Sequence, residues 1–151
     1  MFWRNTKKSK TANNMAKKLK LNLITPQKQL LTDLEVDMVV LPAFLGEMGI
    51  LPGHVPVLVQ LTYGDLRYKK DGKDFDFAVM GGFVEVKDDV VNAFAEGADL
   101  ADEIDEEAEN QKIKKAKDAL SKKDADIDFE LAEIELKQAI TRMKVKRRKL
   151  N

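Results

Sequence analysis

The feature that most constrains the fold is an abrupt change of composition near residue 96. All eight glycines and all four prolines lie at or before Gly97. Glycine and proline mark turns and interrupt helices, so a stretch that lacks both can run in long helices. The sequence therefore predicts an α+β chain: a β-sandwich domain over residues 19–97 and a two-helix hairpin over 98–151, preceded by a basic head, 1–18.

Short alternating apolar runs fill the sandwich part. Leu19, Leu21 and Leu23 alternate with polar residues until Pro26, which is the pattern of a half-buried strand. Further candidate strands follow at 29–31, 35–41, 49–51, 57–61, 65–69, 75–79, 83–87 and 90–95. Because no helical pattern separates them, they predict an antiparallel sandwich or barrel rather than a parallel sheet.

Three turn signals divide these runs. Asp71-Gly72 is a strong hairpin signal between runs that contain Tyr68 and Phe75. A second tight turn is expected at 87–89, and Gly81-Gly82 predicts a break between two strands.

Two helices are expected after Gly97. The first should be capped by Asp99 and run over about 100–120, because acidic residues crowd its first turns. A polar connection at 121–125 and a second helix at about 126–149, with basic residues at its C-terminal end, would complete an antiparallel hairpin. Alanine supplies much of the first helix's apolar face, and a buried leucine contributes roughly 1.5–3 kcal/mol but alanine far less. The hairpin is therefore expected to be the part that opens most readily.

The formal net charge is zero, but its distribution is uneven. The first 20 residues carry seven basic and no acidic side chains, so the head is expected to be disordered. Residues 1–14 could be an extension from an upstream start at Met1, with Met15 the natural start, or a transit peptide. Nucleic acid is not an expected partner, because the acidic body lacks interleaved basic and aromatic residues.

Several kinds of chemistry are excluded by composition. The chain has no cysteine, which removes disulfides, thiolate catalysis and Cys-based zinc sites. It has one histidine, no Walker loop and no Gly-x-Gly-x-x-Gly, so no catalytic residue, metal site or cofactor is predicted. No apolar run approaches the ~20 residues that span a bilayer, so a soluble or membrane-peripheral protein is expected.

Four segments carry a family resemblance: Leu21 to Pro26, Glu35 to Pro42, the loop Gly46 to Pro56, and the Gly-Gly-Phe-Val-Glu-Val run Gly81 to Val86. Together with the charged helical tail, they resemble the epsilon subunit of bacterial-type F-type ATP synthase over residues 19–149. The resemblance implies a sandwich of about ten strands followed by a helical hairpin. It also implies a non-catalytic subunit of the rotor, peripheral to the cytoplasmic face of the bacterial plasma membrane.

The partners that the resemblance implies are the gamma subunit, the ring of c subunits and, when the helices extend, the alpha and beta subunits. The mobile helices would restrain ATP hydrolysis. The alternative from the residues alone is a free-standing β-sandwich binding module with a helical tail and no role in ATP synthase.

Contact residues are expected in the loop 46–56. The resemblance places Glu47 against subunit c, where a carboxylate on a rigid loop can pair with a polar partner. Met48 and Ile50 could form the apolar centre of that contact or pack into the sandwich. His54 is expected to bond backbone and form stalk surface shared with gamma, because one histidine cannot build a triad or zinc site.

The basic residues of the second helix could be solvated charges at a helix C-terminus. The resemblance implies instead that they meet acidic surface on the beta subunits in the extended state. They are Lys137, Arg142, Lys144, Lys146, Arg147, Arg148 and Lys149.

Some family members bind ATP on the folded hairpin. Ile104 and Asp105 match that motif, but Ala108 and Glu109 stand where it has arginine and alanine. Arg142 is retained on the second helix, whereas Gln138 replaces an arginine. Lost cations and an added carboxylate would leave phosphates poorly paired, so ATP binding is not expected.

Overall fold

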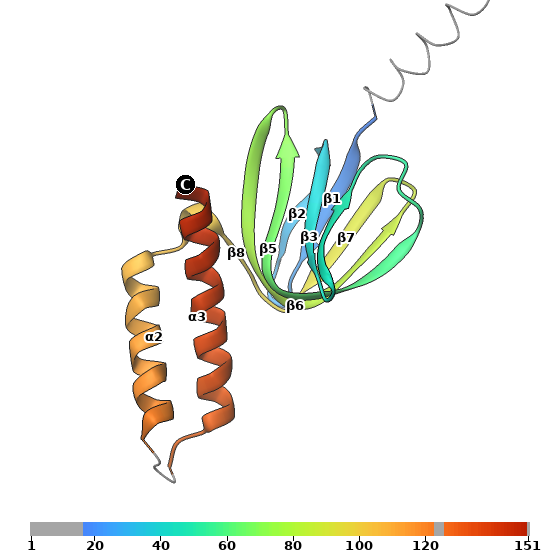
Figure 1. Cartoon of the computed structure of the whole chain (residues 1–151). Coiled ribbons are helices and arrows are strands. Elements are labelled where there is room, and N and C mark those ends of the chain that lie inside the picture. The colour runs from blue at the N-terminus through green and yellow to red at the C-terminus, as the bar shows by residue number, and fades with distance from the viewer. Residues whose placement is uncertain (1–16, 123–125, 151) are drawn as a thin grey trace, which may run out of the picture.

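The computed structural model describes residues 17–122 and 126–150 (Figure 1). Most of the basic head and the middle of the connection between the helices lie outside the described residues. The strands are β1 (Leu19–Ile24), β2 (Gln29–Val36), β3 (Met38–Ala43), β4 (Gly46–Ile50), β5 (Val57–Lys70), β6 (Lys73–Lys87), β7 (Val90–Ala95) and β8 (Ala98–Leu100). A 3₁₀ turn, η1 (Ala101–Glu103), leads to α2 (Glu106–Ser121) and α3 (Phe129–Leu150).

The strands form one sheet in the order β2-β1-β7-β6-β5-β3-β4, with β8 paired to β6. The long strands β5 and β6 bend, so the sheet closes over its own inner face (Figure 1). That face holds the core, which includes the fully buried Leu19, Leu21, Leu23, Leu41 and Leu66. The predicted α+β fold is confirmed, except that β1 pairs with β7 in parallel.

The described residues form eight strands rather than about ten, because β5 and β6 each join two predicted runs. These two strands keep one register from Val57↔Val86 to Lys70↔Lys73. The expected break at Gly81-Gly82 is wrong: both glycines lie within β6 at positive φ, and the strand bends there without ending. The turn at Asp71-Gly72 is confirmed, with both residues at positive φ.

The first helix starts later than predicted. Asp99 does not cap it, because Asp99 lies in β8 opposite Ala78 of β6. Asp105 is the cap, and its carboxylate accepts hydrogen bonds from the backbone N–H groups of Glu107 and Ala108. The sheet therefore continues through Leu100, three residues beyond the expected end of the sandwich.

The helical hairpin packs on the outer face of the β5–β6 pair, opposite the core. Figure 1 shows α3 between α2 and the sheet, with the connected ends of both helices extending past the sandwich. Ala78 and Met80 of β6 contact Val145 of α3, together with Ala101 and Ile104. We call this arrangement the docked hairpin. Within the described part of the chain, neither helix is long and apolar enough to cross a membrane.

A substitution at Gly82 tests the close backbone approach at the bend of β6. Its φ is +117°, and an added methyl group would overlap the Phe94 carbonyl and lie 2.9 Å from the Cα of Ala95. We expect Gly82→Ala to lower the free energy of unfolding by about 3 kcal/mol, from positive-φ strain plus overlap with backbone.

Gly81→Ala is the matched control, because Gly81 also has positive φ but its nearest neighbour would be 3.7 Å away. It should lower the free energy of unfolding by only about 1 kcal/mol in urea titrations. Equal losses in the two variants would contradict the close approach at Gly82.

Candidate functional site

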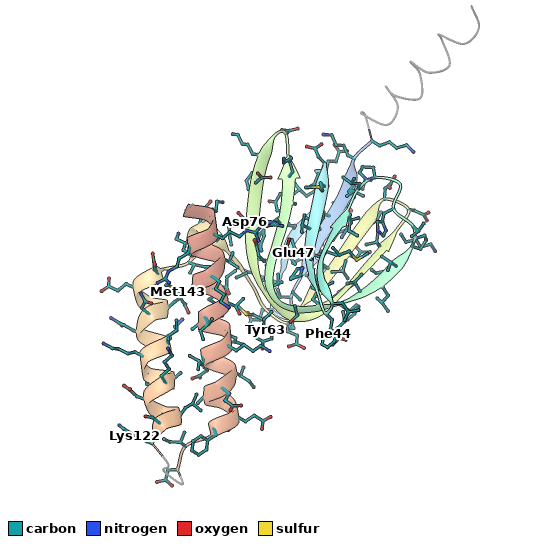
Figure 2. All side chains as sticks on the ribbon, in the orientation of Figure 1. Phe44, Glu47, Tyr63, Asp76, Lys122 and Met143 are labelled. Carbon is teal, nitrogen blue, oxygen red and sulfur yellow. The ribbon has the colours of Figure 1, made fainter. Side chains whose placement is uncertain are left out.

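One end of the sandwich exposes apolar side chains beside the glycine-rich loop. Phe44 and Leu45, in the turn between β3 and β4, are 70% and 96% exposed. Leu51 and Val55 are also exposed, but they follow the opposite end of β4, where Ile50 pairs with Val39 and Gly53 donates a hydrogen bond to Asp89. Figure 2 shows Phe44 at the end of the sandwich away from the C-terminus of α3. The adjacent, exposed Phe44 and Leu45 mark a surface suited to protein contact.

The loop residues expected from the sequence separate into two groups. Ile50 is fully buried in the core, and Met48 packs partly against it, so Ile50 is not available for surface contact. The interior alternative therefore holds for Ile50. His54 is half-buried; its ring Nδ1 lies 2.8 Å from the Val55 carbonyl oxygen, and its backbone N–H donates to Leu51.

Glu47 is exposed but already paired. Its Oε2 accepts a hydrogen bond from Arg67 at 2.9 Å, and its Oε1 accepts one from Arg148 of α3 at 3.2 Å. The carboxylate that the sequence assigned to a partner contact thus also contacts the docked hairpin.

Arg142 of α3 contacts both β8 and α2. Its Nε donates to Asp99 of β8 at 2.7 Å, and its Nη1 lies 3.6 Å from Glu109 of α2. Glu109 is 6% exposed and also pairs with Lys112 at 2.9 Å. A buried carboxylate requires such cations, so Arg142 ties α2 and α3 to the edge of the sheet.

The basic C-terminal end of α3 is bound to acidic neighbours. Arg147 pairs with Glu106 at 3.2 Å and Lys149 with Asp102 at 3.1 Å. Lys146 donates to the Asp102 carbonyl at 3.4 Å. Lys137 lies 4.3 Å from the centre of the Tyr63 ring, a cation–π distance. Lys144 is exposed and makes no ion pair with the described residues.

The residues of the expected nucleotide motif have other contacts. Ile104 is buried in the seam between η1 and the sheet, and Asp105 caps α2. A cavity of about 480 Å³ between α2 and α3 is lined by Lys112, Lys115, Gln138 and Arg142, among others. Because Glu109 and Asp99 already pair with Arg142, its charge is compensated within the chain. The absence of ATP binding stays a prediction.

Two buried carboxylates were not anticipated from the sequence. Asp65 of β5 and Asp76 of β6 are each 9% exposed and lie on the outer face, under the end of α3. Burial raises the pKa of Asp65 to about 7, with the charge of Asp76 adding to the effect. Burial also raises the pKa of Asp76. Alternation in β5 and β6 places both aspartates outward but gives no sign that a helix covers them.

A mostly antiparallel sandwich that carries a docked helical hairpin on its outer face defines a two-part α+β class of protein. Two sequence profiles match this chain. The beta-sandwich domain of the ATP synthase delta/epsilon chain matches residues 18–101, and its long alpha-helix domain matches residues 102–147. The chain belongs to the ATP synthase delta/epsilon chain family, which confirms the resemblance seen in the sequence.

Curated relatives are similar over most of their length. The ATP synthase epsilon chain of Desulforamulus reducens is 42% identical over 130 residues, which cover 86% of this chain and 98% of the relative. That of Elusimicrobium minutum is 48% identical over 109 residues, which cover 72% and 81%.

Solved structures show the same fold. A chain of the Euglena gracilis mitochondrial ATP synthase, in a structure of OSCP, F1 and the c-ring, matches with a TM-score of 0.72 and 26% identity, covering 89% of this chain and 82% of that one. A chain from the Tetrahymena thermophila mitochondrial ATP synthase central stalk and c-ring matches with a TM-score of 0.53 and 16% identity. It covers 89% of this chain and 98% of that one.

Arg142 is expected to be the main polar tie between the hairpin and the sheet. Arg142→Leu should raise hydrogen exchange in α2 and α3 by about tenfold, because it leaves the buried Glu109 with Lys112 alone. Arg147→Leu is the matched control: its pair with Glu106 is exposed, and such pairs contribute about 0–1 kcal/mol. Equal exchange rates in the two variants would contradict this role.

Proposed function

We propose that this chain is a central-stalk rotor subunit of a bacterial-type F1Fo ATP synthase that joins the gamma subunit to the c-ring. It carries out no catalysis itself and lies at the cytoplasmic face of the plasma membrane through its complex. Family membership and the exposed loop end of the sandwich support this role. The Euglena neighbour belongs to an assembly that contains F1 and the c-ring.

The observation that carries the proposal is the division of the molecule into two contact surfaces. The exposed Phe44 and Leu45 in the β3–β4 turn, with Met48 in β4 and with Leu51 and His54 beyond the far end of that strand, lie on a rigid sandwich and suit a permanent contact. The hairpin has a small apolar contact with β6, and ion pairs from Arg142 to Asp99 and from Lys149 to Asp102 flank it, which can be exchanged for pairs with another protein. Failure of the full chain to co-purify with a gamma subunit would reject the rotor assignment.

The helices are proposed to restrain ATP hydrolysis after they leave the sandwich. The 16 residues of α2 and the 22 of α3 would span roughly 57 Å in line, at 1.5 Å per residue. The basic residues from Lys137 to Lys149 would then meet acidic surface on the beta subunits. Attraction of this kind weakens as salt increases.

Glu47 is proposed to contact the c-ring. Glu47→Gln in the gamma-bound chain should weaken co-sedimentation with purified c-ring by about tenfold, since hydrogen bonds to charged groups contribute about 1.5–3 kcal/mol. The control is Arg148→Gln, which removes the hairpin's contacts with Glu47 and Asp65 but keeps the Glu47 carboxylate, and should leave co-sedimentation unchanged. Equal losses would assign the effect to the hairpin.

A substitution at Lys144 tests whether the extended helices restrain ATP hydrolysis. Charge reversal at 146–149 is expected to raise ATPase activity, but Arg147, Arg148 and Lys149 also hold the docked hairpin. Lys144 has no such pair among the described residues, so Lys144→Glu changes the extended contact without changing docking.

We expect Lys144→Glu to raise ATP hydrolysis by the assembled enzyme about two- to fivefold, the effect of losing one ion pair of about 0.5–1 kcal/mol. Lys87→Glu, at the exposed end of β6, is the matched control and should leave hydrolysis unchanged. Hydrolysis at the wild-type rate in Lys144→Glu would sink the proposed contact.

A further inference from the structure

The docked hairpin buries two carboxylates that would otherwise face water. Asp65 and Asp76 lie on the outer face of the β5–β6 pair, in line with Tyr63, Ala78 and Met80, and not on the core face. The elements packed on that face are η1 and α3 (Figure 2 labels Tyr63 and Asp76 beside α3). Because the outer face of a sheet is solvated unless another element covers it, docking itself causes this burial.

Asp65 receives little compensation for the loss of water. Neither of its oxygens has a hydrogen-bond partner among the described residues. Two guanidinium groups are near: Arg148 Nη1 lies 3.2 Å and Arg67 Nη1 3.9 Å from Oδ2. Against them stand the negative charges of Asp76 and Glu47.

Asp76 has a similar mixed environment. Lys149 of α3 favours its ionised form, whereas Asp74 of β6 and Asp102 of η1 disfavour it. A cavity of about 490 Å³ beside it is lined by Arg67, Lys69, Asp74 and Lys149, so no single cation is committed to Asp76. Both aspartates are therefore hard to keep ionised while the hairpin is docked.

We propose that docking of the hairpin is coupled to proton uptake by Asp65, with Asp76 assisting, so that acidification strengthens docking and alkalinisation favours release. This device is distinct from a simple salt bridge. If the positive charge of Arg148 outweighed the effect of burial on Asp65, docking would favour the ionised carboxylate, and acid would release the hairpin instead.

The direction follows from linkage. In the docked chain burial raises the pKa of Asp65 to about 7. In the undocked chain the side chain is solvated, and its pKa should return towards the ordinary value of about 3.9. The docked state then binds more protons between these values, and its advantage is lost as pH rises through about 7. One such group strengthens docking about tenfold between pH 8 and pH 6.

Hydrogen exchange of the full chain tests this directly. Protection factors of α3 amides, corrected for the intrinsic rate at each pH, report the opening equilibrium even when the open state is rare. We expect them to be about tenfold higher at pH 6 than at pH 8. Amides of β1, in the sandwich core, serve as the internal control for stability changes unrelated to docking.

Two substitutions separate Asp65 from other charges. Asp65→Asn is nearly isosteric and permanently neutral, so α3 should stay protected at pH 8 and lose most of its pH dependence; Arg148 keeps Glu47 as partner. Asp102→Asn removes an exposed docking pair with Lys149 and should lower protection without removing the pH dependence.

The proposal is overturned if α3 protection does not depend on pH, falls at pH 6, or keeps its tenfold change in Asp65→Asn. Should that variant fail to fold, carboxyl NMR titration of the wild-type chain decides. A midpoint for Asp65 near 7 supports the proposal, and one near 4 overturns it. Neither measurement depends on whether a released hairpin inhibits ATP hydrolysis.

Discussion

The packing of α3 on the outer face of β5 and β6 is the interaction on which the arrangement of the molecule depends. Its apolar seam consists of Ala78, Met80, Ala101, Ile104 and Val145, whereas the sandwich core contains many fully buried leucines and valines. Since buried apolar area sets the main stabilising term, the sandwich is held by far more free energy than the hairpin. The two parts can therefore have separate stabilities within one chain, with the sandwich as a fixed platform.

The charges at the edge of this seam stabilise the docked hairpin and also limit it. Ion pairs such as Arg147–Glu106 are exposed and contribute little individually. Arg142 is different, because it compensates the buried Glu109 and bonds Asp99 of the sheet. In the proposed extended state the same cations would need other acidic partners, so docking and extension compete for one set of side chains.

Much of the fold could be predicted because the signals were local. The loss of glycine and proline after Gly97 gave the change from strands to helices, and Asp71-Gly72 gave its turn. The prediction that a strand ends at Gly81-Gly82 was wrong, because hydrophobic periodicity does not distinguish a bend within a strand from its end. Asp105 rather than Asp99 caps α2, because Asp99 lies in β8, which pairs with β6 far away in the sequence.

The site was less predictable, because it too depends on contacts between residues far apart in the sequence. Asp65 and Asp76 occupy polar positions of alternating strands, and their burial depends on η1 and α3, which follow later in the chain. Two apolar residues at these positions would enlarge the seam and hold the hairpin more tightly. The reason is that the free-energy cost of removing a charge from water often exceeds the gain from its ion pair. In the proposed coupling, the two aspartates weaken docking when they are ionised, so the stability of the docked state depends on a proton. The proposed restraint of ATP hydrolysis requires the hairpin to leave the sandwich, so the least stabilising residues of the interface are the ones that suit this proposed function best.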